Sequence, residues 1–189
     1  MERNRQMIIG VTGTIGAGKG TVVERLVDKG FKHFSVRAFI SEEIDRRGLP
    51  VNRDNMTSVA NDLRSKHCPE YIAMELFRQA KASGGDAVIE SLRTTGEIDY
   101  LRRQGKFVLI AVDADPVLRY QRTRVRGSET DDITLEKFIS DEEREMHSSD
   151  PHKQNISACI KLADVVLFNN ATKEEFFKDI DEVAETWNQ

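Results

Sequence analysis

The chain has 189 residues, 39% hydrophobic and 32% charged, so it is long enough to bury a core within one domain. Its 28 lysines and arginines against 32 aspartates and glutamates give a net charge of −4, which excludes the basic coat of a general nucleic-acid-binding protein. The longest apolar run, Phe107 to Val112, is far shorter than the ~20 residues of a membrane-spanning helix. We therefore expect a single domain with neither nucleic acid nor membrane as a partner.

The amino terminus, the cysteines and the histidines favour a cytoplasmic protein without a metal cluster. Residues 1–6 lead into an apolar stretch that is too brief for a signal peptide. Cys68 and Cys159 lack CxxC spacing, and we expect two reduced, buried thiols without a role. The four histidines show no metal-ligand spacing: His33, His67, His147 and His152.

Apolar runs typical of buried strands alternate along the chain with amphipathic stretches typical of helices. The first half predicts strands over 7–12 and 34–36 and helices over 19–29, 38–48, 54–66 and 70–82. The second half predicts strands over 87–89, 107–112 and 165–168 and helices over 95–104, 116–126, 134–147 and 173–187. This alternation predicts an α/β fold of three layers (α/β/α), in which helices cover both faces of a five-stranded parallel sheet.

A glycine-rich segment joins the first predicted strand to the first helix and follows the pattern G-x-x-x-x-G-K. Its glycines let successive backbone N–H groups converge on phosphate oxygens, and the helix N-terminus adds positive potential. Lys19 is placed to reach the outer phosphates of a nucleoside triphosphate. Gly20 stands where many such loops have Ser or Thr, and Thr21 follows it. The cofactor-binding residues predicted here are Gly13, Gly16, Ala17, Gly18, Lys19, Gly20 and Thr21.

The run Gly-x-x-Gly-Ala-Gly-Lys-Gly-Thr resembles that of adenylate kinase and its relatives, the nucleoside monophosphate kinases, and the similarity continues in order along nearly the whole chain. The resemblance implies a P-loop NTPase fold with ATP and Mg²⁺ as cofactors. It also implies a helical insertion over about 37–84 that binds the acceptor nucleotide, and a short lid over about 124–134.

A carboxylate and an arginine follow the third predicted strand, in Glu90-Ser91-Leu92-Arg93. Glu90 ends a strand beside the phosphate loop and is well placed, with Thr21, to hold Mg²⁺, in part through water; Arg93 can point into the same crevice. The matching stretch of the kinase family is Asp-Gly-Phe-Pro-Arg, one residue longer. The resemblance implies that Arg93 holds the acceptor phosphate. The alternative is an ion pair of Glu90 and Arg93 that caps the strand.

Three arginines lie on one face of the predicted helix over 116–126. At about 100° per residue, Arg119, Arg122 and Arg126 fall within about 60° of one another. No acidic residue is interspersed to pair with them, so we expect their anion to be the triphosphate. An adjacent face, predicted to pack against the sheet, carries Val117, Leu118 and Val125.

The next segment resembles the family's lid, in which an arginine is followed by a short polar loop, paired aspartates and a helix with a further arginine. Here the loop runs from Gly127 to Asp132. The resemblance implies that Arg126 and Arg144 clamp the transferring phosphoryl group, and one such arginine contributes on the order of 10³–10⁵ in rate. A mobile acidic loop with scattered salt bridges is the alternative.

Weaker candidates come from the insertion and from the end of the last strand. Arg37, Arg53 and Arg64 are candidates for acceptor contacts, and Asn61 could read a base or sugar. The segment 169–172 corresponds to the relatives' loop beside the donor base; a helix N-cap by Thr172 is equally favoured.

The acceptor is predicted from the balance of carboxylates and arginines. The segments 9–13 and 163–169 also resemble dephospho-coenzyme A kinase, which carries an aspartate just after its second strand. A sugar-hydroxyl acceptor profits from such a base, whereas a phosphate acceptor needs only cations. This chain has Ser35-Val36-Arg37-Ala38 there, and Ala38 also departs from the aspartate of many nucleoside monophosphate kinases.

The arginines favour an ATP-dependent phosphotransferase that moves the γ-phosphate to a nucleoside or deoxynucleoside monophosphate. Dephospho-coenzyme A kinase-like phosphorylation of a sugar hydroxyl is one alternative. A nucleotide-binding regulator or ATPase without a small-molecule acceptor is another, although a sensor has little use for Arg93 at the acceptor end of the crevice.

Overall fold

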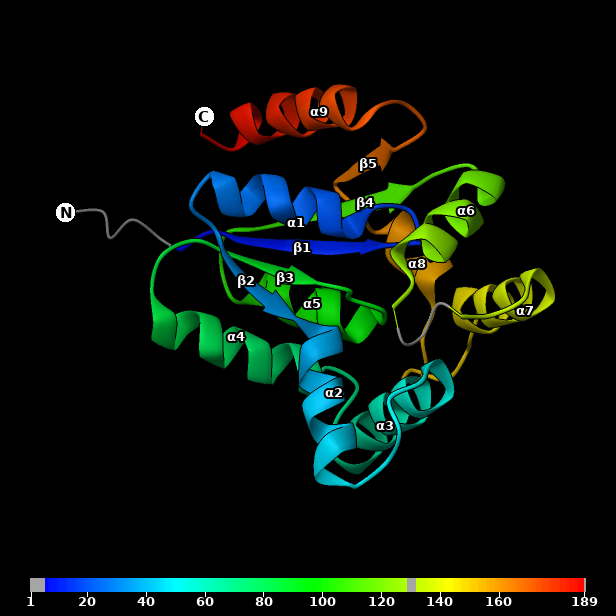
Figure 1. Cartoon of the computed structure of the whole chain (residues 1–189). Helices are drawn as coiled ribbons and strands as arrows, with labels where there is room; N and C mark the ends of the chain where they lie inside the picture. Colours follow the sequence, from blue (N-terminus) through cyan, green and yellow to red (C-terminus); the bar gives the residue numbers. More distant parts are fainter. Residues whose placement is uncertain (1–5, 129–131, 189) are drawn as a thin grey trace.

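The computed structural model describes residues 6–128 and 132–188. Five parallel strands form one sheet in the order β2-β3-β1-β4-β5 (Figure 1). The strands are β1 (Ile8–Gly13), β2 (Lys32–Ser35), β3 (Ala87–Glu90), β4 (Phe107–Asp113) and β5 (Val165–Phe168). In the central strand, Gly10 lies between Ile89 of β3 and Leu109 of β4. The predicted five-stranded parallel sheet is confirmed.

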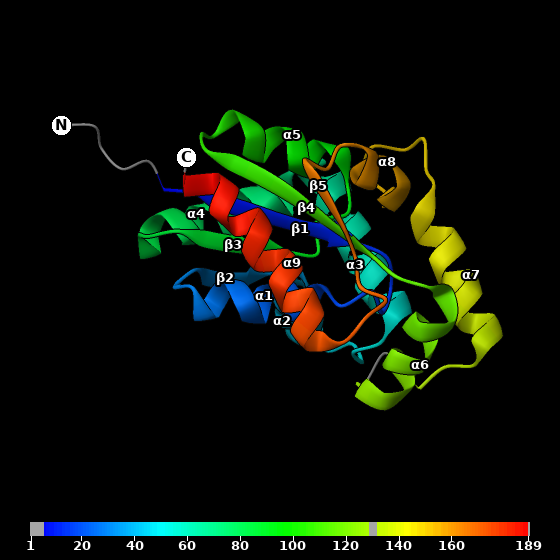
Figure 2. The same ribbon diagram turned by 90° about the horizontal axis from the view of Figure 1, so that it is seen from above.

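Helices cover both faces of this sheet, as Figures 1 and 2 show. The helices are α1 (Lys19–Asp28), α2 (Val36–Arg46), α3 (Arg53–Lys66), α4 (Tyr71–Ser83), α5 (Thr95–Arg103), α6 (Pro116–Arg126), α7 (Leu135–Met146), α8 (Ile156–Lys161) and α9 (Lys173–Glu185), with a final 3₁₀ turn (Thr186–Asn188). The helices α1 and α9 lie on one face, and α4, α5 and α8 lie on the other. The predicted three-layer architecture is therefore also confirmed.

The alternation of β1 divides its side chains between two apolar cores. Ile9 and Val11 pack with α1 and α9, whereas Ile8 packs with the helices of the opposite face. All six residues of β1 are buried, which explains why its sequence is an almost continuous apolar run rather than an alternating one. The core thus fixes the direction in which β1 leads into the glycine-rich segment.

The carboxyl ends of the strands face a group of helices that extend beyond the sheet: α2 and α3 on one side and α6 and α7 on the other (Figure 1). Within the predicted insertion over about 37–84, α4 packs against β2 and β3, so only α2 and α3 project from the sheet. Residues 129–131, at the centre of the predicted lid, lie outside the described residues.

The predictions for β2, α2 and α8 differ from the structure. The strand β2 spans Lys32–Ser35 rather than residues 34–36. The helix α2 begins at Val36 rather than at residue 38, because the Ser35 hydroxyl accepts a hydrogen bond from the Ala38 amide at 3.2 Å and caps the helix. The short helix α8 was not predicted, since its six residues are too few for a clear apolar period; its cap, Asn155, accepts from the Ala158 amide at 3.1 Å.

Among the helices of residues 6–128 and 132–188, none combines the length and the apolar character that a bilayer crossing requires. Cys68 and Cys159 are both free thiols, as predicted, but only Cys159 is buried; the prediction that Cys68 is buried is wrong, because it is half-buried. Burial, followed by the neighbouring Glu97, raises the pKa of the Cys159 thiol to about 12. Such a thiol is protonated at neutral pH, in agreement with an unreactive core residue.

Candidate functional site

The phosphate loop, residues 13–18 between β1 and α1, is held by close backbone contacts. Gly13 has a φ of +139° and Gly18 a φ of +103°, in the region that L side chains rarely adopt. A Cβ on Gly13 would overlap with the carbonyl oxygen of Val112, and one on Gly18 with Nδ2 of Asn169. The glycines therefore let the loop press against β4 and against the segment after β5.

Side chains from the two neighbouring strand ends also hold the phosphate loop. Thr14 Oγ1 donates to Asp113 Oδ1 at 2.7 Å, and buried Asn169 donates through Nδ2 to the Ala17 carbonyl at 2.9 Å. Thr172 instead caps α9, since its hydroxyl accepts from the Glu175 amide at 3.2 Å. The helix-cap alternative for Thr172 is confirmed, and Asn169 supports the loop.

Lys19 is the first residue of α1, and its side chain turns back over the phosphate loop. The ammonium Nζ donates to the carbonyls of Gly13 at 3.1 Å and Thr14 at 2.7 Å. Burial and the nearby Arg93 lower the pKa of Lys19 to about 7. Gly20 and Thr21 follow in the first turn, with open space around the Cα of Gly20. Anionic phosphates at this loop would favour the protonated form of Lys19.

A cavity of about 740 Å³, including its open mouth, lies beside the phosphate loop and between α2, α3 and the end of β3. Six cationic side chains line it: Lys19, Arg37, Arg53, Arg64, Arg93 and Arg126. Among residues 6–128 and 132–188, these six cations are accompanied in the lining by only two carboxylates, Glu90 and Glu145. The structure thus gathers most of the predicted cations around one space, and their excess makes the cavity suited to an anion.

Arg64 is the most deeply buried of these cations, with no exposure to solvent. It forms an ion pair with Glu97, which is equally buried. Its Nε and Nη2 donate to Glu97 Oε1 at 3.1 and 2.8 Å. Arg64 comes from α3 and Glu97 from α5, so this ion pair fixes the projecting helix to the core.

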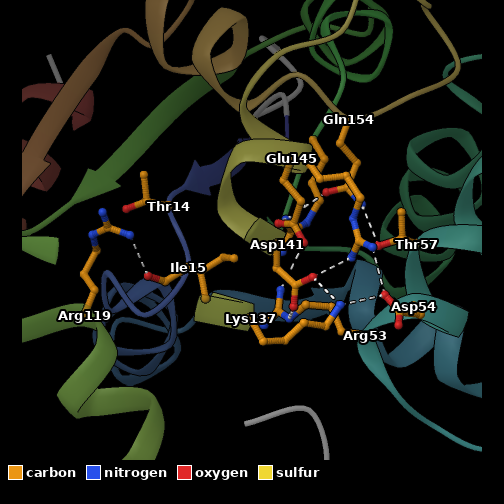
Figure 3. A network of polar contacts seen from close by, with 12 residues as sticks. Thr14, Ile15, Arg53, Asp54, Thr57, Arg119, Lys137, Asp141, Glu145 and Gln154 are labelled. Carbon is orange, nitrogen blue, oxygen red and sulfur yellow. Dashed lines mark hydrogen bonds and ion pairs between the residues drawn. The ribbon is translucent and has the colours of Figure 1, made fainter. Parts of the chain in front are cut away.

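A second buried carboxylate, Glu145 of α7, joins two further arginines of the cavity, of which Arg53 is labelled beside it in Figure 3. Arg53 Nη1 donates to Glu145 Oε1 at 3.0 Å, and Arg93 Nη1 contacts the other carboxylate oxygen and donates to Gln154 at 3.0 Å. Burial alone would raise the pKa of Glu145, but Arg93 and Arg53 hold it below its ordinary value. Glu145 is therefore an ionised counter-ion inside the cavity wall.

Ion pairs outside the cavity extend the connection between α3 and α7. Arg144 donates to Asp54 at 2.8 Å and lies 3.0 Å from Asp141, which also accepts from Lys137 at 2.9 Å. Arg144, predicted as a lid arginine, is not among the residues that line the cavity in the described part of the chain. It stabilises the contact between the two helices instead.

Arg119 is 4% exposed and is bound to protein groups. Its Nε donates to the Ala114 carbonyl at 2.9 Å. Its Nη1 donates to the Ile15 carbonyl at 3.2 Å (Figure 3) and also contacts Glu142. The expectation that a triphosphate supplies its anion is wrong, because Glu142 of α7 does so. A search for acids on the same helix cannot find this tertiary partner.

Because the face of α6 that carries Arg119 is buried, the other side chains of this helix lie elsewhere than predicted. Arg126 lines the cavity, and Arg122 has a buried Nη1 without a hydrogen-bond partner in the described residues. Val117 is 64% and Val125 89% exposed, so the prediction that they pack against the sheet is wrong. Arg119, with Thr123, occupies the buried face instead.

Glu90 and Ser91 form the wall of the cavity at the end of β3. Glu90 lies 3.1 Å from His33 Nε2 and accepts from the Ser91 hydroxyl at 3.0 Å. Burial would raise the pKa of Glu90, but the His33 contact, the charge of Lys19 and the Ser91 hydrogen bond hold it below its ordinary value. Glu90 is thus ionised at neutral pH beside Lys19, and no pair of Glu90 with Arg93 occurs among the described ion pairs.

Four polar residues around the cavity are not predicted from the sequence: Glu97, Glu142, Glu145 and Gln154. Asn61, a candidate for reading a base or sugar, is not among the residues that line the described cavity. One signal was available for Glu97, because Thr94-x-x-Glu97 is a capping box, and the structure contains it. Glu142 and Glu145 carry no local signal, since their partners lie on other elements.

A sequence-family model described as AAA domain (AAA_18) matches residues 9–148. The chain belongs to this AAA domain family. The matched range begins in β1 and ends after α7. It includes the phosphate loop and nearly every residue that lines the cavity. Over 182 residues the chain is also 29% identical to the UPF0200 protein MJ1399 of Methanocaldococcus jannaschii, covering 95% of this chain and 89% of that protein.

Solved structures with the same fold include kinases. TT1252 from Thermus thermophilus matches with a TM-score of 0.62 at 19% identity, over 96% of this chain and 97% of that one. Shikimate kinase from Bacteroides thetaiotaomicron gives 0.56 at 14% identity, over 95% and 98%. A gluconokinase from Sinorhizobium meliloti gives 0.55 at 15% identity, over 96% and 97%. The predicted resemblance to P-loop kinases is therefore confirmed at the level of the fold.

Proposed function

We propose that this protein is an ATP-dependent phosphotransferase that moves the γ-phosphate to a nucleoside or deoxynucleoside monophosphate. The observation that carries the proposal is the cavity beside the phosphate loop, which six cations and two carboxylates of the described part of the chain line. Two phosphate groups that approach one another need such an excess of positive charge, because their mutual repulsion opposes transfer.

The donor side of the proposed reaction rests on the phosphate loop. The glycines whose Cβ positions are blocked let the loop pack against β4 and the segment after β5. A glycine-rich loop at a helix N-terminus can present its backbone N–H groups to the phosphates of ATP. Lys19 would hold the outer phosphates, and Arg126 would neutralise charge on the moving phosphoryl group. Arg119 would act indirectly, by holding the Ile15 carbonyl and so the shape of the loop.

The residues present also fit a magnesium ion. Mg²⁺ is usually held by one or two carboxylates together with substrate phosphates and water, and Glu90 offers an ionised carboxylate beside Lys19. Glu90, with the Thr21 hydroxyl, would hold the ion, in part through water. Bound there, Mg²⁺ supplies charge neutralisation for the donor phosphates.

On the acceptor side, Arg93, Arg64 and Arg37 would bind the phosphate that receives the phosphoryl group. An acceptor oxygen would form the new bond to the γ-phosphorus while the bond to the β–γ bridging oxygen breaks. The products are ADP and a nucleoside diphosphate, and no proton needs to be removed from a phosphate acceptor. This accounts for a site rich in arginine that has no acid between Ser35 and Ile40.

One observation favours a second candidate, transfer to a sugar hydroxyl. Glu90 lines the cavity in ionised form and could accept the hydroxyl proton. The solved kinases with the same fold include one named for shikimate and one named a gluconokinase, so small acceptors other than nucleotides belong in the test.

A screen of ADP formation from ATP and Mg²⁺ tests the proposal directly. We expect at least one common nucleoside or deoxynucleoside monophosphate to raise the rate well above that with ATP alone. Dephospho-coenzyme A, shikimate and gluconate are the comparison acceptors. A response to one of these alone would favour the hydroxyl candidate, and equal rates with every acceptor would contradict phosphotransfer to a small molecule.

Two variants then test the residues. Lys19→Ala is expected to lower the transfer rate by about 10²–10³, because the site loses a cationic hydrogen-bond donor to the ATP phosphates. Arg93→Ala is expected chiefly to raise the KM for the acceptor. Lys81→Ala and Arg103→Ala remove exposed cations of α4 and α5 and are the matched controls. Wild-type transfer by Lys19→Ala, or an unchanged acceptor KM and kcat in Arg93→Ala, would contradict the assigned roles.

A further inference from the structure

The carboxylate of Glu97 makes four hydrogen bonds with two parts of the acceptor site. Through Oε1 it accepts from Arg64 Nε at 3.1 Å and Nη2 at 2.8 Å. Through Oε2 it accepts from the backbone amides of Arg93 at 2.8 Å and Thr94 at 3.2 Å. One buried carboxylate thus fixes a guanidinium on α3 and the main chain that carries Arg93 after β3.

The capping of α5 accounts for only one of these four hydrogen bonds. Glu97 is the third residue of α5, and its contact with the Thr94 amide completes the capping box. A capping box needs neither the ion pair with Arg64 nor the contact with Arg93. Both groups are also inaccessible to solvent, and a buried ion pair on its own is weak evidence of a contribution to stability. The additional bonds call for another explanation.

The explanation lies in Nη1 of Arg64, the guanidinium nitrogen that Glu97 does not bind. Nη1 is the one guanidinium nitrogen of Arg64 that has no hydrogen-bond partner in the described residues. Arg64 lines the cavity together with Arg93 and Arg37. Leaving a buried cationic donor unpaired is unfavourable, so Nη1 is suited to an anionic acceptor that enters the cavity.

We infer that Glu97 is a positioning residue of the acceptor site: it orients Arg64 so that Nη1 faces the anionic group of the acceptor, and it sets the main chain of Arg93 from the same carboxylate. The inference rests on the proposed function for the identity of the acceptor. Glu97 does not line the cavity and does not touch the acceptor. Its effect on acceptor binding passes through Arg64 and Arg93.

The first experiment separates acceptor binding from ATP binding in Glu97→Gln, with the best acceptor from the screen. Glutamine has the same shape but loses the charge that holds Arg64. We expect the KM for the acceptor to rise at least tenfold, while the KM for ATP stays within twofold. Asp99→Asn, an exposed acid of the same helix, is the matched control and is expected to change neither. Equal increases in both KM values, or no increase, would overturn the inference.

A second pair of variants tests whether Glu97 acts through Arg64. In an Arg64→Met background, adding Glu97→Gln is expected to raise the acceptor KM by less than half of the factor that it causes alone. A purely structural role of Glu97 predicts the full factor in both backgrounds, and that result would contradict the inference. Urea unfolding of each variant identifies those that are folded under assay conditions.

A third measurement needs no turnover, so it distinguishes failure of this inference from failure of the proposed function. Protein saturated with ADP is titrated with inorganic phosphate by calorimetry, so that the phosphate loop is occupied and the titration reports the acceptor cavity. We expect binding at least tenfold weaker in Glu97→Gln and in Arg64→Lys, which keeps the charge but loses Nη1. If Glu97→Gln does not fold, Arg64→Lys carries the test. Unchanged phosphate binding in a folded variant would overturn the inference, whatever acceptor the screen finds.

Discussion

The phosphate loop and the acceptor cavity meet at Lys19, but different forces hold them in place. The loop is fixed by close packing, since the Cβ of another residue at Gly13 would overlap with the Val112 carbonyl. The cavity wall is fixed by buried charge pairs, Arg64 with Glu97 and two arginines with Glu145. The loop should therefore tolerate no added atom at Gly13, whereas the cavity wall should tolerate no lost charge.

The largest effect is expected from a methyl group added to the loop. Gly13→Ala should lower the free energy of unfolding by about 4 kcal/mol, because an L residue is forced to a positive φ and into the β4 backbone. Gly20→Ala is the matched control, since a Cβ there meets open space in the first turn of α1. The control should be neutral or gain up to about 1 kcal/mol. Urea unfolding measures both, and equal losses would refute packing as the force that fixes the loop.

The next effect tests the acceptor side with a change that adds no atom. Glu145→Gln should lower the free energy of unfolding by about 3 kcal/mol at pH 7, because Arg53 and Arg93 lose their shared counter-ion. Glu143→Gln, exposed on the same helix, is the control and should change the free energy by less than about 0.5 kcal/mol. If Glu145→Gln lowers the free energy of unfolding as little as the control does, the ion pairs of Glu145 do not stabilise the cavity wall.

The pH dependence of the same variant gives an independent check. The pKa of Glu145 lies below its ordinary value of 4.5 in the folded protein, so the stabilisation is complete above about pH 5 and is lost as the pH falls through the lowered pKa. The difference in unfolding free energy between wild type and Glu145→Gln should therefore shrink between about pH 5 and pH 3. A constant difference over this range would show that the charge of Glu145 is not its cause.

The same contrast explains which features the sequence predicts. The sheet and the phosphate loop follow from local patterns, such as the buried run of β1 and the glycines at positive φ, and their ranges agree with the structure within a few residues. The cavity-lining cations could be predicted from the sequence, because the resemblance to kinases continues in order along the chain and assigns site residues segment by segment. The counter-ions could not, because Glu142 and Glu145 meet Arg119 and Arg93 only through the packing of α7.

Lys19 joins the two regions, and its protonation provides the third prediction. With a pKa of about 7 in the free protein, Lys19 is mostly neutral at pH 8, and bound phosphates should restore its proton. ATP binding should then take up close to one proton at about pH 8, and its affinity should fall about tenfold per unit of rising pH above that. Calorimetry in buffers of different ionisation enthalpy measures the uptake. Lys19→Arg, which stays protonated, should bind without uptake, so equal uptake by this variant would assign the proton to another group.

The smallest effect concerns a strained backbone position in the cavity wall, at the end of β3. Ser91 has a φ of 71°, the only positive φ at a non-glycine residue in the described chain, and its amide and that of Leu92 both donate to the Val11 carbonyl. Ser91→Gly removes the strain of about 1–2 kcal/mol, but it adds backbone freedom to the unfolded chain and loses the hydrogen bond to Glu90, so we expect little net change in stability. Ser91→Ala keeps the strain and loses the hydrogen bond to Glu90, so it should be less stable than wild type. If Ser91→Gly is instead less stable than Ser91→Ala, the side-chain contacts of Ser91 contribute more to stability than its backbone strain costs. This segment would then be held by polar contacts, as the rest of the cavity wall is.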